Sequence, residues 1–213
     1  MPTAAIKICG ISTPDALEAA IRARADHIGL VFFPKSPRAV TPADAALLSA
    51  RAEGRINRVG LFVDPDDALL AEAVAAARLD AIQLHGAEKP ERAAQLRSRF
   101  GIPIWKALSV ASAADVERAS AYTHAVDLVL FDARTPKGAL PGGMGLAFDW
   151  NLVANWKGPV AWGLAGGLEP GNVAEAIRRT KTPLVDTSSG VETAPGVKDA
   201  DRIAAFCAAA AGA

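Results

Sequence analysis

Two residues of the chain are suited to moving protons, a cysteine near the N-terminus and an aspartate in the second half. Cys9 ends one short apolar run, and Asp132 ends another after Leu128 and Leu130. A thiolate can accept a proton from carbon, and a carboxylic acid can deliver one to oxygen. A free thiol has a pKa of about 8.5, so a base working near neutrality needs a lowered pKa, to which Lys7 is a candidate contributor. The pair predicts the two-group proton shuttle that an isomerisation requires.

Two short segments rich in small residues and hydrogen-bond donors point to a bound anion. Residues 163–167 read Gly-Leu-Ala-Gly-Gly, and residues 186–190 read Asp-Thr-Ser-Ser-Gly. Glycine lets backbone N–H groups approach an anion closely, and serine hydroxyls add donors. The residues that we expect to bind phosphate are Gly166, Gly167, Ser188 and Ser189.

A third glycine-rich segment, Pro-Gly-Gly-Met-Gly at 141–145, lies in an unusually long stretch between Asp132 and Asp149. We interpret it as a loop that closes over bound substrate, with Gly143 among the binding residues. The alternative is a flexible connection, with Asp149 capping the next helix.

The elements that must position these residues follow from hydrophobic periodicity, because short apolar runs alternate with Ala-rich amphipathic stretches along the whole chain. The predicted strands are 5–9, 28–33, 59–63, 81–85, 103–107, 128–132, 160–164 and 184–188. The predicted helices are 14–25, 42–52, 65–77, 89–99, 113–121, 149–154, 170–179 and 199–210. Three helices are expected to begin with a polar cap and a first-turn proline, at Thr13-Pro14, Thr41-Pro42 and Asp64-Pro65.

Eight strand–helix units in tandem favour a closed barrel over an open, doubly wound sheet. Their spacing is even, and no GxGxxG turn follows the first strand. We therefore predict an α/β fold, a single (β/α)8 TIM barrel of parallel strands that occupies residues 1–213 as one domain. In such a barrel the active site lies at the C-terminal ends of the strands, where Cys9 and Asp132 occur, and the loops after strands seven and eight often bind phosphate.

Strand alternation places further polar side chains inside the predicted barrel. His85 shares a face with Gln83, and the pattern leaves it open whether His85 lines the site or is a structural hydrogen-bonder. Asp186 shares a face with Ser188 and is a candidate site residue, but we expect it to pair with Lys7, since strands eight and one are neighbours. We expect Cys207 to be a small buried hydrophobe and His27 and His124 to be surface or loop histidines.

Composition limits the partners. Lys+Arg and Asp+Glu both total 23, so the net charge is zero and neither a nucleic acid nor an anionic membrane has electrostatic support. The sequence has no apolar run long enough to cross a bilayer and no metal-ligand spacing, and we expect no secretory signal and, from its two distant cysteines, no disulfide. We expect a cofactor-free, cytoplasmic enzyme that acts on a small-molecule substrate. We also expect the protein to be a monomer in preference to a homodimer.

Distinctive motifs occur over nearly the whole chain. They are Lys7-Ile8-Cys9-Gly10-Ile11, Ser36-Pro37-Arg38, Gln83-Leu84-His85-Gly86, Phe131-Asp132-Ala133, Gly142-Gly143-Met144-Gly145 with Phe148-Asp149-Trp150, Ala165-Gly166-Gly167-Leu168, and Asp186-Thr187-Ser188-Ser189-Gly190-Val191-Glu192. In type and order they resemble the motifs of phosphoribosylanthranilate isomerase, an enzyme family of tryptophan biosynthesis. The resemblance departs at Met144, where the family often has threonine, and at Thr187, where valine is frequent.

The resemblance implies an Amadori rearrangement of N-(5-phosphoribosyl)anthranilate to 1-(2-carboxyphenylamino)-1-deoxyribulose 5-phosphate. It assigns Asp132 to protonation of the ring oxygen and Cys9 to removal of the C2′ proton. It also matches Arg38 to the family's arginine for the anthranilate carboxylate, which a planar guanidinium suits. On the alternative interpretation Arg38 is a solvated loop residue.

Three other functions fit part of the pattern. The histidine-pathway Amadori isomerase resembles a duplicated half-barrel and uses two aspartates, so Cys9 and the absence of a half-chain repeat argue against it. Indole-glycerol-phosphate synthase needs a catalytic lysine, for which Lys106 is the candidate, but the Cys9 motif does not fit it. A non-catalytic barrel that senses or stores a phosphosugar would need neither Cys9 nor Asp132.

Overall fold

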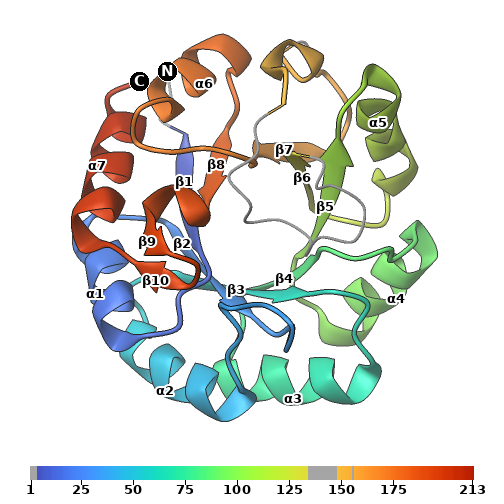
Figure 1. Cartoon of the computed structure of the whole chain (residues 1–213). Coiled ribbons are helices and arrows are strands. Elements are labelled where there is room, and N and C mark those ends of the chain that lie inside the picture. The colour runs from blue at the N-terminus through green and yellow to red at the C-terminus, as the bar shows by residue number, and fades with distance from the viewer. Residues whose placement is uncertain (1–3, 134–147, 155) are drawn as a thin grey trace.

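The strands close into a barrel in the computed structural model, which describes residues 4–133, 148–154 and 156–213 (Figure 1). All neighbouring pairs are parallel, and β8 pairs with β1, so the predicted (β/α)8 barrel is confirmed. Its strands are β1 (Ala5–Cys9), β2 (His27–Val31), β3 (Asn57–Phe62), β4 (Ala81–Leu84), β5 (Ile104–Val110), β6 (Leu128–Ala133), β7 (Ala161–Leu164) and β8 (Leu184–Thr187).

Helices surround the strands as an outer layer (Figure 1). They are α1 (Pro14–Arg22), α2 (Pro42–Ala52), α3 (Asp67–Ala77), α4 (Pro90–Phe100), α5 (Ala113–Glu117), α6 (Val173–Thr180) and α7 (Ala200–Ala211), with 3₁₀ turns η1 (Arg118–Tyr122), η2 (Trp150–Leu152) and η3 (Ser189–Val191). Within the described ranges, no helix is long and apolar enough to cross a membrane.

Two of the three predicted helix caps form, and the third is wrong. The Thr13 hydroxyl accepts from the N–H of Ala16, and Thr41 forms a capping box with Asp44. The third helix is capped by Asp66 instead of Asp64. Asp64 has a left-handed φ of 45°, and its carboxylate accepts from the N–H of Ala87 at 2.7 Å. Because the Asp64 carboxylate is engaged in this contact between two loops, Asp66 caps the helix instead.

Two other predicted helices are shorter than the pattern suggested. The prediction for 149–154 is wrong, because only the turn η2 forms there; Asp149 caps it, and Arg179 of α6 binds the side chain of Asn151 at 2.9 Å. The helix after β7 begins at Val173 and not at 170. Asn172 accounts for this: its side chain accepts from the N–H of Glu169 and donates to the carbonyl of Gly167, both at 2.9 Å, so a turn occupies the space before the helix.

Strand alternation produces two buried layers. Residues such as Ile8, Leu30 and Phe131 point outward and pack beneath the helices. The alternate residues fill the barrel, and they include Val59, Ala81, Trp105, Leu130 and Leu184. These apolar side chains fill the barrel interior toward the N-terminal ends of the strands. The inward-facing polar residues are therefore concentrated toward the C-terminal ends.

Of the two histidines expected on the surface or in loops, one prediction is confirmed and the other is wrong. His124 is exposed in a turn after η1. His27 instead begins β2, and its ring lies edge-on to Trp105 with the ring centroids 5.2 Å apart. Burial lowers the pKa of His27, and the charge of Lys7 adds to this. Alternation along β2 places its first residue, His27, on the same inward face as Gly29 and Val31. That alternation is the signal in the sequence that could have identified His27 as an inward-facing residue.

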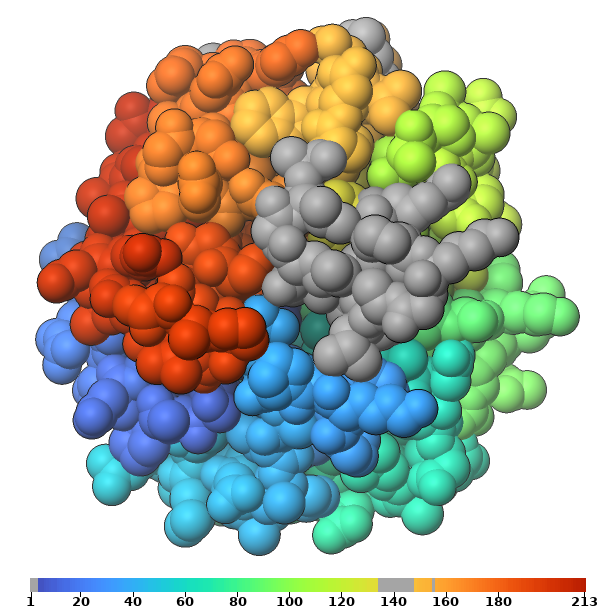
Figure 2. All heavy atoms as spheres, in the orientation of Figure 1, coloured from blue at the N-terminus to red at the C-terminus, as the bar shows by residue number. Residues whose placement is uncertain are grey.

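A hairpin that the sequence analysis did not predict follows β8. It consists of β9 (Glu192–Ala194) and β10 (Val197–Lys198), and the turn between them contains Gly196 with a φ of +84°. A side chain at Gly196 would come within 2.5 Å of the Pro37 carbonyl oxygen, so the hairpin lies against the segment after β2. In the space-filling view its red-orange atoms adjoin the blue atoms of that segment (Figure 2).

Candidate active site

Cys9 lies at the C-terminal end of β1 and points into the barrel with only 5% of its surface exposed. The neighbouring strand makes room for it, because a Cβ at Gly29 would come within 2.6 Å of the Cys9 sulfur. The thiol therefore has an apolar wall on one side. That wall is formed by Val31 and Leu61, with the partly buried Phe33 and Val63 beside them.

Lys7 and Asp186 form a buried ion pair across the junction of β1 and β8. The Lys7 ammonium donates to Asp186 Oδ1 at 2.9 Å, and the lysine is fully buried. The predicted pairing is confirmed, and its cause is the closure of the barrel, which brings the two residues into register. Burial alone would lower the pKa of Lys7, but Asp186 and Cys9 raise it, so the ammonium form is stabilised.

The expected lowering of the Cys9 pKa is wrong for this structure. Burial raises the pKa of the Cys9 thiol, and the charges of Lys7 and Lys198 oppose this only in part. The sequence placed Lys7 correctly on the same face as Cys9, but removal of the thiol from water is the larger effect. The two lysines still supply the positive surroundings that a thiolate needs once it forms.

His85 and Asp132 meet across the barrel mouth. His85 Nε2 lies 3.2 Å from Asp132 Oδ2, and both side chains are at least 90% buried. The other ring nitrogen, Nδ1, lies 3.2 Å from the Gln83 amide nitrogen. His85 thus lies beside Asp132 and is also a hydrogen-bonder, so its position is compatible with both of the roles that the sequence left open. Asp186 interacts electrostatically with Lys7, Asp132 and His85, which makes one polar cluster of the four residues.

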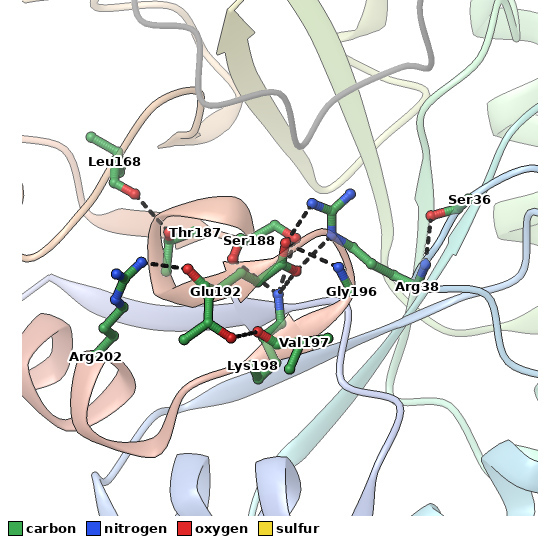
Figure 3. A network of polar contacts seen from close by, with 11 residues as sticks. Ser36, Arg38, Leu168, Thr187, Ser188, Glu192, Gly196, Val197, Lys198 and Arg202 are labelled. Atoms are coloured by element: carbon green, nitrogen blue, oxygen red, sulfur yellow. Dashed lines mark hydrogen bonds and ion pairs between the residues drawn. The ribbon is translucent and has the colours of Figure 1, made fainter.

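Arg38 is buried and engaged by the hairpin, so the interpretation as a solvated loop arginine is wrong (Figure 3). Its Nε and Nη2 atoms donate to the two carboxylate oxygens of Glu192, each at 2.8 Å. Gly10 is needed beneath it, since a Cβ there would come within 2.6 Å of Arg38 Cδ. The pairing occupies the Nε side of the guanidinium and fixes the plane of the group at the mouth of the barrel.

Lys198 connects this arginine to the loop after β8. Its ammonium donates to Glu192 Oε1 at 2.7 Å, to the Ser188 carbonyl at 3.0 Å and to the Ser188 hydroxyl at 3.2 Å (Figure 3). Sequence reasoning missed Lys198 because no hairpin was predicted there. Glu192 was recognised only as part of a motif and had no assigned role.

The two predicted phosphate loops lie side by side. Thr187, one of the departures from the family pattern, donates from its hydroxyl to the Leu168 carbonyl at 2.7 Å and so joins them. Gly166 has a φ of +83°, and a Cβ on it would come within 2.9 Å of Asp132 Oδ1, so the first loop reaches the acidic group. The backbone at the candidate positions is half-buried; these positions are Gly166, Gly167, Ser188 and Ser189.

Two predictions concern residues outside the described part of the chain. They are the substrate-binding role of Gly143 and the closing loop at 141–145, which includes the Met144 departure. Of that segment's motif, only Phe148, Asp149 and Trp150 are described.

Lys106 does not belong to the site. It alternates on β5 with Trp105 and Ala107, which pack inside the barrel, so its side chain points outward. Its ammonium binds the carbonyls of Leu84 and Gly86 at 3.3 and 2.8 Å and Glu88 Oε2 at 3.1 Å. Lys106 is therefore not placed to act as the catalytic lysine that an indole-glycerol-phosphate synthase would need.

Both the sequence and the fold are similar to those of known proteins. The sequence model of the family described as N-(5′-phosphoribosyl)anthranilate (PRA) isomerase matches residues 6–209. The N-(5′-phosphoribosyl)anthranilate isomerase of Paramagnetospirillum magneticum is 53% identical over 208 residues, which cover 97% of both chains. The crystal structure of phosphoribosyl anthranilate isomerase from Thermotoga maritima gives a TM-score of 0.88 at 36% identity, over 99% of this chain and 100% of that one. A phosphoribosyl anthranilate isomerase in complex with reduced 1-(o-carboxyphenylamino)-1-deoxyribulose 5-phosphate gives 0.86 at 34% identity, with the same coverage.

Proposed function

The chain belongs to the N-(5′-phosphoribosyl)anthranilate isomerase family, and we propose that Cys9 and Asp132 are the groups that move protons in its reaction. That reaction is the Amadori rearrangement of N-(5′-phosphoribosyl)anthranilate to 1-(2-carboxyphenylamino)-1-deoxyribulose 5-phosphate, a step of tryptophan biosynthesis. One observation carries the assignment of roles: a thiol with an apolar wall and a histidine-bound carboxyl occupy the same barrel mouth.

Asp132 acts first, as the general acid. It gives a proton to the ring oxygen of the ribose, the bond from C1′ to that oxygen breaks, and the nitrogen lone pair forms the Schiff base. The carboxylate left on Asp132 is stabilised by its contact with His85. An acid with a hydrogen-bonded conjugate base gives up its proton at a lower free-energy cost than one without.

Cys9 acts second, as the general base. Its thiolate takes the proton from C2′, and the electrons of that bond form the double bond of the enolamine, which neutralises the Schiff-base nitrogen. The enolamine then tautomerises to the ketone. The ammonium of Lys7, held beneath the thiol by Asp186, favours the thiolate electrostatically.

The substrate has two anionic ends, and the mouth offers a site for each. We assign the anthranilate carboxylate to Arg38, with the aromatic ring on the apolar wall beside Cys9. We assign the phosphate to the loops of Gly166, Gly167, Ser188 and Ser189. In this assignment Asp186 acts on the substrate through Lys7, His85 lies next to the reacting carbons, and Gly143 remains a predicted contact from the loop outside the described residues.

The finer expectations about partners and location are also proposals. We propose that the chain acts as a monomer in the cytoplasm. In the described part of the chain, the large hydrophobic side chains that are exposed are Leu47 and Val197, which lie on different elements. Isolated exposed apolar residues do not make the contiguous patch that a stable dimer buries. Light scattering at micromolar concentration checks this, and a mass of two chains would contradict it.

The experiment that tests the residue roles follows the loss of anthranilate-type fluorescence after the purified protein meets freshly generated N-(5′-phosphoribosyl)anthranilate. Cys9→Ala and Asp132→Asn should each lower kcat by about 10²–10⁴-fold, as expected for general acid–base groups. A variant with near wild-type turnover would remove that residue from the mechanism and leave the function intact. A folded wild-type protein without turnover would contradict the function itself.

A further inference from the structure

The side chain of Gln83 is a buried amide, and packing alone does not explain why an amide occurs at this position. It lies inside β4, fully buried, in register with Leu61 of β3 and Trp105 of β5. Within the described ranges its side-chain oxygen has no hydrogen-bond partner. An unsatisfied buried polar atom destabilises a fold, so an apolar residue of similar size would suit this position better. Such a group calls for a functional explanation.

Among the described residues, the Gln83 amide makes its hydrogen bond to the imidazole that contacts Asp132. Its Nε2 lies 3.2 Å from His85 Nδ1, while His85 Nε2 lies 3.2 Å from Asp132 Oδ2. The amide nitrogen has no lone pair to offer, so in this orientation it donates, and His85 Nδ1 accepts. A neutral imidazole that accepts at Nδ1 carries its proton on Nε2, the nitrogen that faces Asp132.

The opposite orientation of the amide is disfavoured by burial. If the amide turned over, its oxygen would face His85 and its NH₂ group would take the place of the unpartnered oxygen. Buried N–H groups without partners are rarer than buried carbonyls without partners. The ring would then carry its proton on Nδ1, and Nε2 could only accept, so it would offer no donor to the carboxylate that forms when Asp132 gives up its proton.

We propose that Gln83 is a positioning residue for the acid step, because it fixes His85 in the neutral tautomer with the proton on Nε2. The inference rests on the proposed function of Asp132. When Asp132 gives its proton to the substrate, the waiting Nε2–H donates to the new carboxylate, and this bond strengthens as the negative charge develops. The unpartnered oxygen is the consequence of aiming the amide nitrogen at His85.

The tautomer can be measured without substrate. The chain has three histidines, so the side-chain ¹H–¹⁵N correlations of the ¹⁵N-labelled protein are few, and His85→Asn identifies those of His85. The neutral ring of His85 in the wild type should have its proton on Nε2. Gln83→Met, which keeps the side-chain length, should give a mixture of the two tautomers. A wild-type ring with its proton on Nδ1, or an unchanged tautomer in Gln83→Met, would overturn the proposal.

Kinetics and stability together separate positioning from packing. Gln83→Met should lower kcat about tenfold, the effect of one hydrogen bond lost in the transition state, with KM unchanged. Its Tm should stay close to that of the wild type, since the unpartnered amide oxygen is removed while His85 Nδ1 loses its donor. Ser49→Ala is the matched control, because the Ser49 hydroxyl on α2 is also buried and unpartnered within the described residues. This variant should change neither kcat nor KM.

A merely structural role would lower the Tm and kcat of Gln83→Met together, and that result would contradict the proposal. If the tautomer prediction holds while Asp132→Asn retains full turnover, the proposed function of Asp132 fails and the placement of His85 stands. If Asp132→Asn is inactive while the tautomer prediction fails, the present inference alone is wrong.

Discussion

Gly29 sets the position of the Cys9 thiol, and adding one methyl group there should displace it. A Cβ at Gly29 would lie 2.6 Å from Cys9 Sγ and 3.0 Å from its Cα, whereas ordinary contacts begin at 3.4 Å. The sulfur must therefore move by roughly 0.8 Å, because the repulsive wall of a van der Waals contact is steep. Gly29 does not have a positive φ, so the effect of Gly29→Ala is steric and not a backbone strain.

The displacement should affect both stability and rate. Overpacking a buried site typically destabilises by about 1–3 kcal/mol, and about 2–4 °C of Tm correspond to each kcal/mol in a domain of this size. A misplacement of about 1 Å at a reacting group can lower the rate by about 10²-fold. We therefore expect Gly29→Ala to remain folded, with a Tm lowered by a few degrees and kcat lowered by about 10–100-fold.

Two glycines provide matched controls in the fluorescence assay. A Cβ at Gly60 would come within 2.3 Å of Leu79 Cδ1, on the outward side of β3, so Gly60→Ala should lower the Tm without affecting kcat. A Cβ at Gly171 would meet nothing closer than 3.7 Å, so Gly171→Ala should change neither quantity. Wild-type kcat in Gly29→Ala, or an equal loss of kcat in Gly60→Ala, would refute the argument that the position of the thiol limits the rate.

Three further predictions concern the charged groups around the thiol. Arg38→Ala should raise KM with a smaller effect on kcat, and unchanged KM and kcat/KM would refute its role in carboxylate binding. Asp186→Asn leaves the Lys7 ammonium buried without its counter-charge and should destabilise by about 3–5 kcal/mol in urea unfolding, whereas an unchanged midpoint would mean that Lys7 is deprotonated or solvated. Because burial raises the pKa of Cys9 and the base must be deprotonated, kcat/KM should rise with pH across the alkaline range. Lys7→Met removes an opposing charge and should move that rise to higher pH, and a pH profile identical to that of the wild type would contradict the electrostatic role of Lys7.

The barrel and its polar residues could be predicted because each depends on short-range pattern. Alternation within β1 and β8 was enough to place Lys7, Cys9 and Asp186 on inward faces. The ion pair of Lys7 with Asp186 followed from closure alone, since the first and last strands of a closed barrel must be neighbours. His27 is the exception, because the apolar pattern predicts a strand only from residue 28, whereas β2 begins at His27.

Helix boundaries were less predictable, because contacts from distant residues decide them. Asp64 and Asp66 are equally good caps by type, and the loop contact of Asp64 with Ala87 selects Asp66. The amphipathic pattern at 149–154 produced only η2, since Arg179 holds Asn151 in the turn. The helix propensity of a short segment predicts its structure poorly where tertiary contacts compete with it.

By itself, the sequence determined the fold class, the strands that carry Cys9 and Asp132, and the family, since all three are encoded in residue type and spacing. Only the tertiary structure decided which groups meet and how strongly burial acts on them. It brought Lys198 and Glu192 to Arg38 through a hairpin without a clear sequence signal. It also made the pKa of Cys9 rise instead of fall, because desolvation depends on every atom packed around the thiol and not on the lysine two residues before it.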